Sequence, residues 1–144
     1  MYPHRIRLRG RWEYEPVSGP APLPAPGRMT MPCRWRDQGL PGFSGKVRFR
    51  RHFGYPGRID YFERVWLTFA GLTGTADIRL NGHRLGSGKA EEPFEFEVTS
   101  LLQNRNVLEV EVVGPEDGGL WGEVALEIRL LAVPKSENKI GPAL

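Results

Sequence analysis

Apolar and polar residues alternate along six segments between Lys46 and Leu130. Alternation with a period of two predicts strands with one buried and one solvated face, and such strands are typical of antiparallel sheets packed face to face. We therefore expect an all-β fold, an antiparallel β-sandwich. The apolar members of the six segments are Val47, Phe49 and Phe53; Val65, Leu67 and Phe69; Ala76, Ile78 and Leu80; Phe94, Phe96 and Val98; Leu108, Val110 and Val112; Val124, Leu126, Ile128 and Leu130.

A hairpin signal lies inside the third segment. There the alternation runs into Asn81-Gly82, and this dipeptide favours the two-residue turns that join neighbouring antiparallel strands. We predict a second hairpin turn at Gly86-Ser87-Gly88-Lys89, which no helix follows, so that this glycine-containing stretch is not a phosphate-binding motif.

The N-terminal part is less regular. Residues 5–15 predict one or two short strands around Gly10, with Ile6, Leu8, Trp12 and Tyr14 on one side. The proline-rich segment 16–27 predicts a surface loop, because proline cannot donate to a strand ladder. A short strand at 28–33, with Met29 and Met31 on one side, and a loop at 35–44 follow.

Two further features concern the C-terminal half. A single helical turn is expected at residues 100–103, with Thr99 as its cap. Residues 135–144 carry no pattern and are expected to be a flexible tail. With 144 residues, of which 40% are hydrophobic, the chain fits one domain with one core, which we place at residues 1–134.

One cysteine, Cys33, excludes an internal disulfide framework, as is usual in a reducing compartment. We expect Cys33 to be a small buried residue, although Arg34 and Arg36 beside it could lower a thiol pKa. The N-terminus lacks the apolar stretch of an export signal, and no apolar run approaches 18 residues. A cytoplasmic protein without a membrane partner is the expectation.

The charge distribution argues against a nucleic-acid partner. Residues 1–64 hold 13 Lys and Arg against 5 Asp and Glu, whereas residues 65–144 hold 7 against 12. Two halves of opposite sign in one sandwich favour cross-strand ion pairs over a basic surface. We expect Arg48 and Arg50 to face Glu95, Glu97, Glu109 and Glu111.

The residues that could carry catalysis are not grouped as catalysis requires. Glu95 and Glu97, like Glu109 and Glu111, fall on outward strand positions, where nothing would desolvate a general acid. The histidines, His4, His52 and His83, lack the spacing of metal ligands. We therefore expect no catalytic residues, no metal and no cofactor.

A set of segments stands in the order and spacing of a known family: Trp35 with 45–53, then 64–72, 76–82 with Leu85-Gly86, 93–99, Leu102, 106–108, and 118–121 with Val124. Together these segments resemble the N-terminal sugar-binding domain of glycoside hydrolase family 2, which includes β-galactosidases, β-glucuronidases and β-mannosidases. The resemblance spans roughly residues 10–130 and implies a galactose-binding-like jelly roll.

The family pattern also bears on catalysis and on sugar contacts. Catalysis in the family uses two glutamates of a separate (β/α) barrel, about 5 Å apart, and these residues are not matched in this chain. In the β-galactosidases, an asparagine before the matched tryptophan reaches the substrate, and Arg34 stands at that position. Asp117 lies near the position of an acidic residue that approaches the sugar, and Gly122 replaces an arginine.

Two functions follow as hypotheses. The first is a non-catalytic carbohydrate-binding module, because a sugar site needs an aromatic platform surrounded by planar donors and acceptors. Alternatively, Trp35 and Trp121 seal the ends of the core and bind nothing. The candidate residues for a carbohydrate or glycoside are Arg34, Trp35, Asp37, Gln38, Asp117 and Trp121.

The second hypothesis is an accessory module that binds a protein partner or itself and has lost sugar binding. Trp66 motivates it, because this residue lies at an outward position between Val65 and Leu67. The alternative is that the proline-rich segment 16–27 of the same chain covers Trp66.

Overall fold

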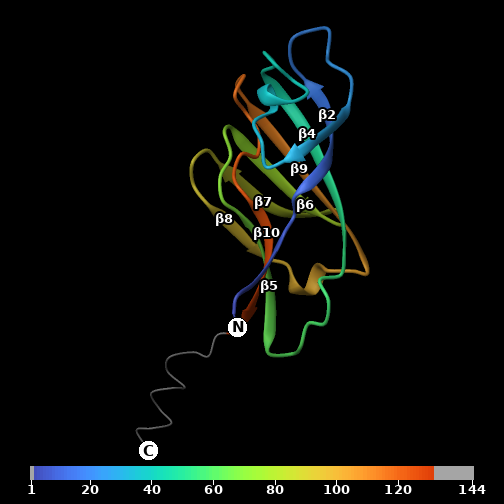
Figure 1. The fold of residues 1–144 in the computed structure, drawn as a ribbon, viewed down its shortest axis with the longest axis vertical. Helices are drawn as coiled ribbons and strands as arrows, with labels where there is room; N and C mark the ends of the chain where they lie inside the picture. Colours follow the sequence, from blue (N-terminus) through green and yellow to red (C-terminus); the bar gives the residue numbers. More distant parts are fainter. Residues whose placement is uncertain (1, 132–144) are drawn as a thin grey trace, which may run out of the picture.

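The computed structural model describes residues 2–131 as two antiparallel sheets packed face to face (Figure 1). The expected flexible tail at 135–144 lies outside the described residues, as does Pro134, the expected end of the domain. No helix within 2–131 has the length and apolar character needed to cross a membrane. The all-β sandwich predicted from the alternating pattern is confirmed.

The smaller sheet has four strands in the order β1-β10-β5-β8, and the larger has six in the order β3-β2-β4-β9-β6-β7. The strands of the smaller sheet are β1 (His4–Arg7), β5 (Glu63–Phe69), β8 (Phe94–Glu97) and β10 (Val124–Leu130). Those of the larger sheet are β2 (Gly10–Ser18), β3 (Gly27–Met31), β4 (Gly45–Gly54), β6 (Thr75–Leu80), β7 (His83–Lys89) and β9 (Arg105–Gly114).

The core lies between the sheets and is built from the inward positions of the alternating segments. On β5, for example, Val65, Leu67 and Phe69 are buried, whereas Arg64, Trp66 and Thr68 are partly exposed. The largest fully buried side chains are Trp12, Trp35, Phe49, Phe69, Met29, Leu40, Leu67, Leu72, Ile78, Leu80, Leu108 and Leu120.

The Asn81-Gly82 turn between β6 and β7 is confirmed. Both residues have positive φ (52° and 83°), as a tight hairpin turn requires. Asn81 also ties the turn to β9, because its Oδ1 accepts from the Val107 N–H at 2.9 Å and its Nδ2 donates to Asn106 Oδ1 at 2.9 Å. Asn106 is 1% exposed, so these bonds also satisfy a buried amide.

The expected hairpin turn at Gly86–Lys89 is wrong, because these residues lie inside β7. Gly86 and Gly88 leave the space that the rings of Phe96 and Phe94 occupy, since an added Cβ would lie 2.7 Å and 2.2 Å from ring carbons of those residues. The glycines thus serve close packing of β7 against β8 rather than a chain reversal.

The N-terminal segment crosses between the sheets. Residues 8–9 separate β1, which pairs with β10, from β2, which begins at Gly10 and pairs with β3 and β4. Leu8, Trp12 and Tyr14 are buried as predicted, whereas Ile6 is 38% exposed because β1 lies at the edge of the smaller sheet. In β3, Met29 and Met31 are buried as expected.

The proline-rich loop is shorter than predicted. Strand β2 continues through Pro16, which is buried opposite Val47 next to an irregularity in the register, and the connection to β3 covers only residues 19–26. Proline is tolerated there because β3 pairs with β2 only up to Tyr14, so the missing N–H falls beyond the ladder on that side.

The helical turn is a 3₁₀ turn over Thr99–Leu101, one residue earlier than expected. Thr99 does not cap it: its Oγ1 accepts instead from the Val65 N–H at 2.8 Å. A second 3₁₀ turn at Trp35–Asp37 lies within the loop predicted at 35–44.

The predicted pairing of charges across strands is correct for half of the carboxylates. Arg48 pairs with Glu111 at 2.8 Å and Arg50 with Glu109 at 2.7 Å on the outer face of the larger sheet. Glu95 and Glu97 belong to the other sheet, so they pair with Arg129 at 2.7 Å and Arg64 at 3.7 Å instead.

Candidate functional site

Three loops meet at the upper end of the sandwich in Figure 1: residues 32–44 before β4, 70–74 after β5 and 115–123 before β10. Backbone hydrogen bonds join them. The Trp35 N–H donates to Gly118 O at 2.9 Å, the Thr73 N–H to Gly119 O at 3.1 Å, and the Gly122 N–H to Gly71 O at 3.0 Å. Side chains on these loops are therefore held at fixed relative positions.

Arg34, Thr73, Asp117 and Trp121 form one cluster on these loops, called here the loop-end cluster. Thr73 Oγ1 accepts from Arg34 Nη1 at 2.9 Å and from Trp121 Nε1 at 3.0 Å. Arg34 Nη1 also donates to the Asp117 carbonyl at 3.1 Å and lies 3.7 Å from its carboxylate. The Arg34 guanidinium carbon lies 5.4 Å from the centre of the Trp121 ring, within reach of a cation–π interaction.

The loop-end cluster remains partly open to solvent. The side chain of Arg34 is 31% exposed and that of Asp117 is 44% exposed. Among contacts with described residues, the Arg34 guanidinium uses Nη1 alone, which leaves the donors on Nε and Nη2 for a ligand. The cluster thus offers planar donors, a carboxylate acceptor and part of an indole ring on one surface.

Sequence reasoning missed Thr73, although its hydroxyl is the shared acceptor of the cluster. Thr73 sits outside the alternating strands in the segment Gly71-Leu72-Thr73-Gly74, and a lone threonine in a loop gives no pattern to detect. Only the approach of the 115–123 loop, through the Thr73–Gly119 bridge, reveals its role.

Trp35 lies beneath this surface and is 0% exposed. Its Nε1 donates to the Phe43 carbonyl at 2.9 Å, and its ring stacks on Phe49 with centroids 6.4 Å apart. Gly118 makes this packing possible, because an added Cβ would lie 2.6 Å from the Trp35 ring. This geometry corresponds to the alternative in which Trp35 seals the core, since no face of its ring reaches the surface.

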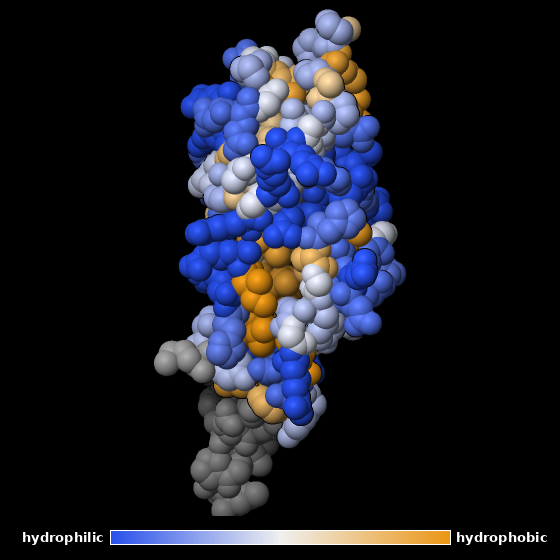
Figure 2. Space-filling model, turned by 45° about the vertical axis from the view of Figure 1, so that its right-hand side comes forward, coloured by the Kyte–Doolittle hydropathy of each residue, from blue (hydrophilic) through white to orange (hydrophobic). Residues whose placement is uncertain are grey.

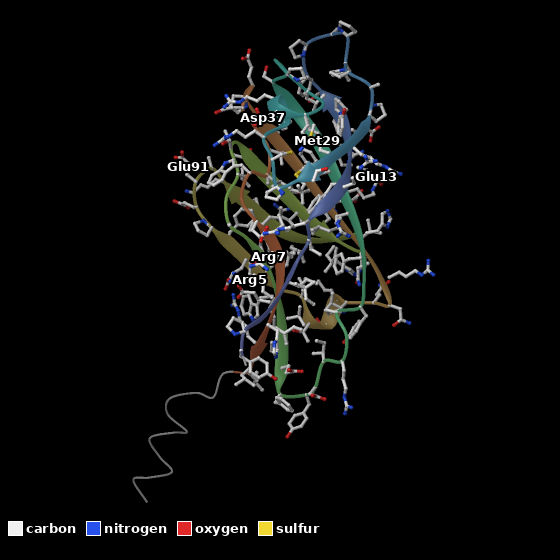
Figure 3. All side chains as sticks on the ribbon, viewed as in Figure 1. Arg5, Arg7, Glu13, Met29, Asp37 and Glu91 are labelled. Carbon is white, nitrogen blue, oxygen red and sulfur yellow. The ribbon has the colours of Figure 1, made fainter. Side chains whose placement is uncertain are left out.

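Of the other two candidates, Asp37 adjoins the loop-end cluster through Asp117, whereas Gln38 does not. Asp37 faces Asp117 across a shallow depression of about 490 Å³ between residues 36–42 and 115–117, at the upper end where Figure 3 labels Asp37. Gln38 instead pairs with the backbone of Thr30, whose N–H and C=O it meets at 2.8 Å each. The Gln38 amide is therefore occupied by β3.

Cys33 adjoins this end, is partly buried where a buried residue was expected, and is not activated. Its Sγ lies 3.7 Å from the Met31 sulfur and 4.0 Å from that of Met29. Burial, helped by the negative charge of Asp37, raises the pKa of the thiol to about 11. The flanking arginines therefore do not lower it, and the thiol stays protonated at neutral pH.

Trp66 lies on the outer face of the smaller sheet, partly exposed as its parity predicted. The guanidinium of Arg129 covers it, with 4.9 Å between Cζ and the ring centroid, while also pairing with Glu95 and Glu127. Coverage by the proline-rich segment is wrong: at Gly19 this segment packs on Phe43 and Ser44, beside the larger sheet.

Glu95 and Glu127 lack the environment of a general acid. Hydrogen bonds from Arg129 hold the pKa of Glu95 below its ordinary value, and those from Arg5 do the same for Glu127. Catalytic acids need the opposite shift. Within residues 2–131, no three residues among His, Cys, Asp and Glu lie close enough to hold a metal ion.

These features define a galactose-binding-like β-sandwich with a polar cluster on its loop end. Residues 44–120, more than half of the chain, match the family described as glycosyl hydrolase 2 galactose-binding domain-like. The chain belongs to this family, which confirms the resemblance read from the segments inside this range, such as 76–82; Trp35 and Trp121 lie outside the matched residues. The match concerns this domain, and residues 2–131 contain no catalytic barrel.

Solved structures of β-glucuronidases share the fold. The enzyme of Bifidobacterium dentium, complexed with coumarin-3-O-glucuronide, is 26% identical with a TM-score of 0.74, over 90% of this chain and 31% of that enzyme. The Faecalibacterium prausnitzii enzyme is 21% identical with a TM-score of 0.76, over 89% and 32%. The Dictyoglomus thermophilum enzyme is 15% identical with a TM-score of 0.74, over 89% and 28%.

This chain thus spans less than a third of the length of each of these enzymes. A search of curated proteins gave no match.

Proposed function

We propose that this chain is a non-catalytic carbohydrate-binding module and that the loop-end cluster is its sugar site. The observation that carries the proposal is the position of Arg34 over Trp121 beside Asp117. Sugars present hydroxyl groups, which suit a guanidinium and a carboxylate, and apolar C–H faces, which suit an indole ring. The glycoside bound by the Bifidobacterium dentium relative supports the ligand class.

Two features give the cluster the stiffness that recognition needs. Thr73 fixes Arg34 and Trp121 through one hydroxyl, and the loop backbones are joined to each other. A site held before the ligand arrives loses less conformational entropy on binding.

Intrinsic fluorescence tests the proposal. Trp12 and Trp35 are fully buried, so Trp121 and Trp66 are the tryptophans that can respond to a ligand. A Trp66→Phe variant removes the second signal. Titration with galactose, glucuronic acid and mannose should then give saturable quenching by one of them.

Arg34→Met should weaken that binding about tenfold or more, because a charge-assisted hydrogen bond contributes about 1.5–3 kcal/mol. Arg28→Met, at an exposed arginine on β3, is the matched control and should leave the affinity unchanged. Silence across the sugar panel from a folded protein, or equal effects of the two variants, would refute the proposal.

A further inference from the structure

The two flanks of the sandwich differ. On one flank, β7 and β8 close the gap between the sheets, because Phe94 and Phe96 pack on Gly88 and Gly86, and Phe94 stacks on Phe69 at 4.7 Å. On the opposite flank, β1 of the smaller sheet faces the end of β4 in the larger sheet across a gap lined in part by Phe53 and Tyr55. We call this flank the open seam.

Both strands that border the open seam have an unpaired edge. Among residues 2–131, strand β1 is the last strand of its sheet and pairs with β10 alone. Strand β4 pairs with β2 only from Lys46 to Arg50, so residues 51–54 have no strand neighbour on the side away from β9 within the described part of the chain. The His52 carbonyl accepts from the Arg51 side chain instead of from a strand. Unpaired edges of this kind accept an added strand.

Between these edges lies an apolar hollow of about 450 Å³. Ile6 and Tyr55 at its border are 38% and 41% exposed. Figure 2 shows apolar surface in a hollow on this side of the molecule, bordered by hydrophilic residues. The lining residues are Ile6, Arg7, Leu8, Arg51, Phe53, Gly54, Tyr55, Pro56 and Leu126.

The charged residues of this lining, Arg7 and Arg51, are both arginines. Arg7 lies on β1, where Figure 3 labels it, and shares one carboxylate, Glu123, with Arg9. Arg51 has no carboxylate within 4.0 Å among the described residues. Its guanidinium donates to the Arg9 carbonyl at 3.0 Å. The seam therefore carries positive charge that the described part of the chain does not neutralise.

Arg51 stands where the strand pattern calls for an apolar residue. It shares the inward parity of Val47, Phe49 and Phe53 on β4, and burial lowers the pKa of its guanidinium. An inward-pointing charge at an unpaired edge has two physical explanations. It either discourages accidental strand pairing or meets an acidic group of a partner.

We propose that the open seam binds an extended segment of a partner polypeptide in which apolar and acidic residues alternate. The segment would pair with the edge of β1 or of residues 51–54, insert apolar side chains beside Ile6 and Phe53, and place a carboxylate on Arg51. The apolar lining and the absence of acidic lining residues select this chemistry. The proposal does not depend on sugar binding at the other end of the molecule.

The test uses the full chain and a fluorescein-labelled octapeptide of alternating Glu and Val, with an octapeptide of alternating Lys and Val as the opposite-charge control. Fluorescence anisotropy should show saturable binding of the acidic peptide and at least about tenfold weaker binding of the basic one. Arg51→Gln and Ile6→Ser should each weaken binding of the acidic peptide about tenfold. Arg58→Gln, at a side chain that is 90% exposed, should not.

Hydrogen exchange locates the peptide. Binding should slow exchange of amides in residues 4–7 or 51–54, and melting temperatures of the variants would confirm that they are folded. If Arg51→Gln is unfolded, Arg51→Lys, which keeps the charge but loses the planar donors, takes its place.

Other outcomes would overturn the proposal. No binding of the acidic peptide, or tighter binding by Arg51→Gln, would show that Arg51 only guards the edge. Slow exchange of the seam amides in the free monomer would show that the chain covers its own seam. A dimer in sedimentation that Ile6→Ser dissociates would assign the seam to a second copy of the chain.

Discussion

The guanidinium of Arg34 lies 5.4 Å from the ring centre of Trp121, and both side chains donate to the same hydroxyl. Trp35, the neighbour of Arg34 in sequence, points the other way into the core. Of these two consecutive residues, Arg34 thus belongs to the surface cluster and Trp35 to the core of the sandwich. Substitutions at Trp35 and Trp121 should therefore differ in their effect on stability.

Trp35→Ala should cost about 3–5 kcal/mol of unfolding free energy, because it empties a fully buried site. Trp121→Ala should cost only about 1–2 kcal/mol, because the ring is partly exposed and makes one hydrogen bond. Urea unfolding of both variants checks this order. Equal losses would mean that Trp121 is also a core residue.

Gly118→Ala should destabilise the fold by about 1–3 kcal/mol, because its Cβ would lie 2.6 Å from the Trp35 ring. Gly54→Ala is the matched control: its Cβ would meet nothing closer than 3.9 Å, so a change within about 0.5 kcal/mol is expected. Thermal unfolding of the two variants gives the comparison. If Gly118→Ala left the melting temperature unchanged, the loop before β10 would have to shift away from the Trp35 ring at little cost.

Cys33 should react slowly with iodoacetamide in the folded protein. Its thiol pKa of about 11, against the ordinary 9.0, leaves about a hundredfold less thiolate near pH 8. The alkylation rate of the native protein, compared with that of the urea-unfolded chain at the same pH, measures the difference. Similar rates in both states would contradict the partial burial of this thiol beside Met29 and Met31.

Glu127 should stabilise the fold at neutral pH and lose this effect in acid. Hydrogen bonds from Arg5 and then from Arg129 lower its pKa below 4.5, so the contribution is present above 4.5 and disappears as the pH falls through the lower native value. Glu127→Gln should therefore be about 1–2 kcal/mol less stable than the wild type near pH 7. The difference in unfolding free energy between wild type and variant should decrease steadily as the pH is lowered, as urea unfolding at several pH values would measure. A difference that does not change with pH would exclude the ion pairs of Glu127 as its cause.

Trp66→Ser should leave the molar mass in light scattering unchanged. Arg129 stacks on the indole of Trp66 and forms ion pairs with Glu95 and Glu127. The indole on the outer face of β5 is therefore covered from within the chain and needs no second copy to cover it. A wild-type dimer that becomes a monomer in the variant would return Trp66 to the role of an interface residue.

Sequence alone predicted the parts of the fold that local patterns specify. Alternation placed Val65, Leu67 and Phe69 in the core, and Asn81-Gly82 fixed a turn through its positive φ values. The failures arise where distant segments decide the outcome. Gly86 lies in a strand because the ring of Phe96 packs on it. Thr99 does not cap the helical turn because its hydroxyl oxygen accepts a hydrogen bond from the Val65 N–H.

The candidate site shows the same boundary. Arg34, Asp117 and Trp121 could be named from residue type and family resemblance, and the structure brings these three together. The burial of Trp35 and the hydrogen bonds between Gln38 and the backbone of Thr30 depend on how the loops pack, which no local sequence pattern indicates. Thr73, which joins two of the cluster's side chains, carried no signal at all.

The pairing of β1 with β10 has a consequence for how the chain folds. His4 lies opposite Ile128, and β10 stands in the middle of the smaller sheet, between β1 and β5. During synthesis β1 must wait for β10, its partner among the described strands, because β10 is translated only at residues 124–130. High contact order of this kind slows folding and leaves β1 and β5 without their shared neighbour until translation has passed Leu130.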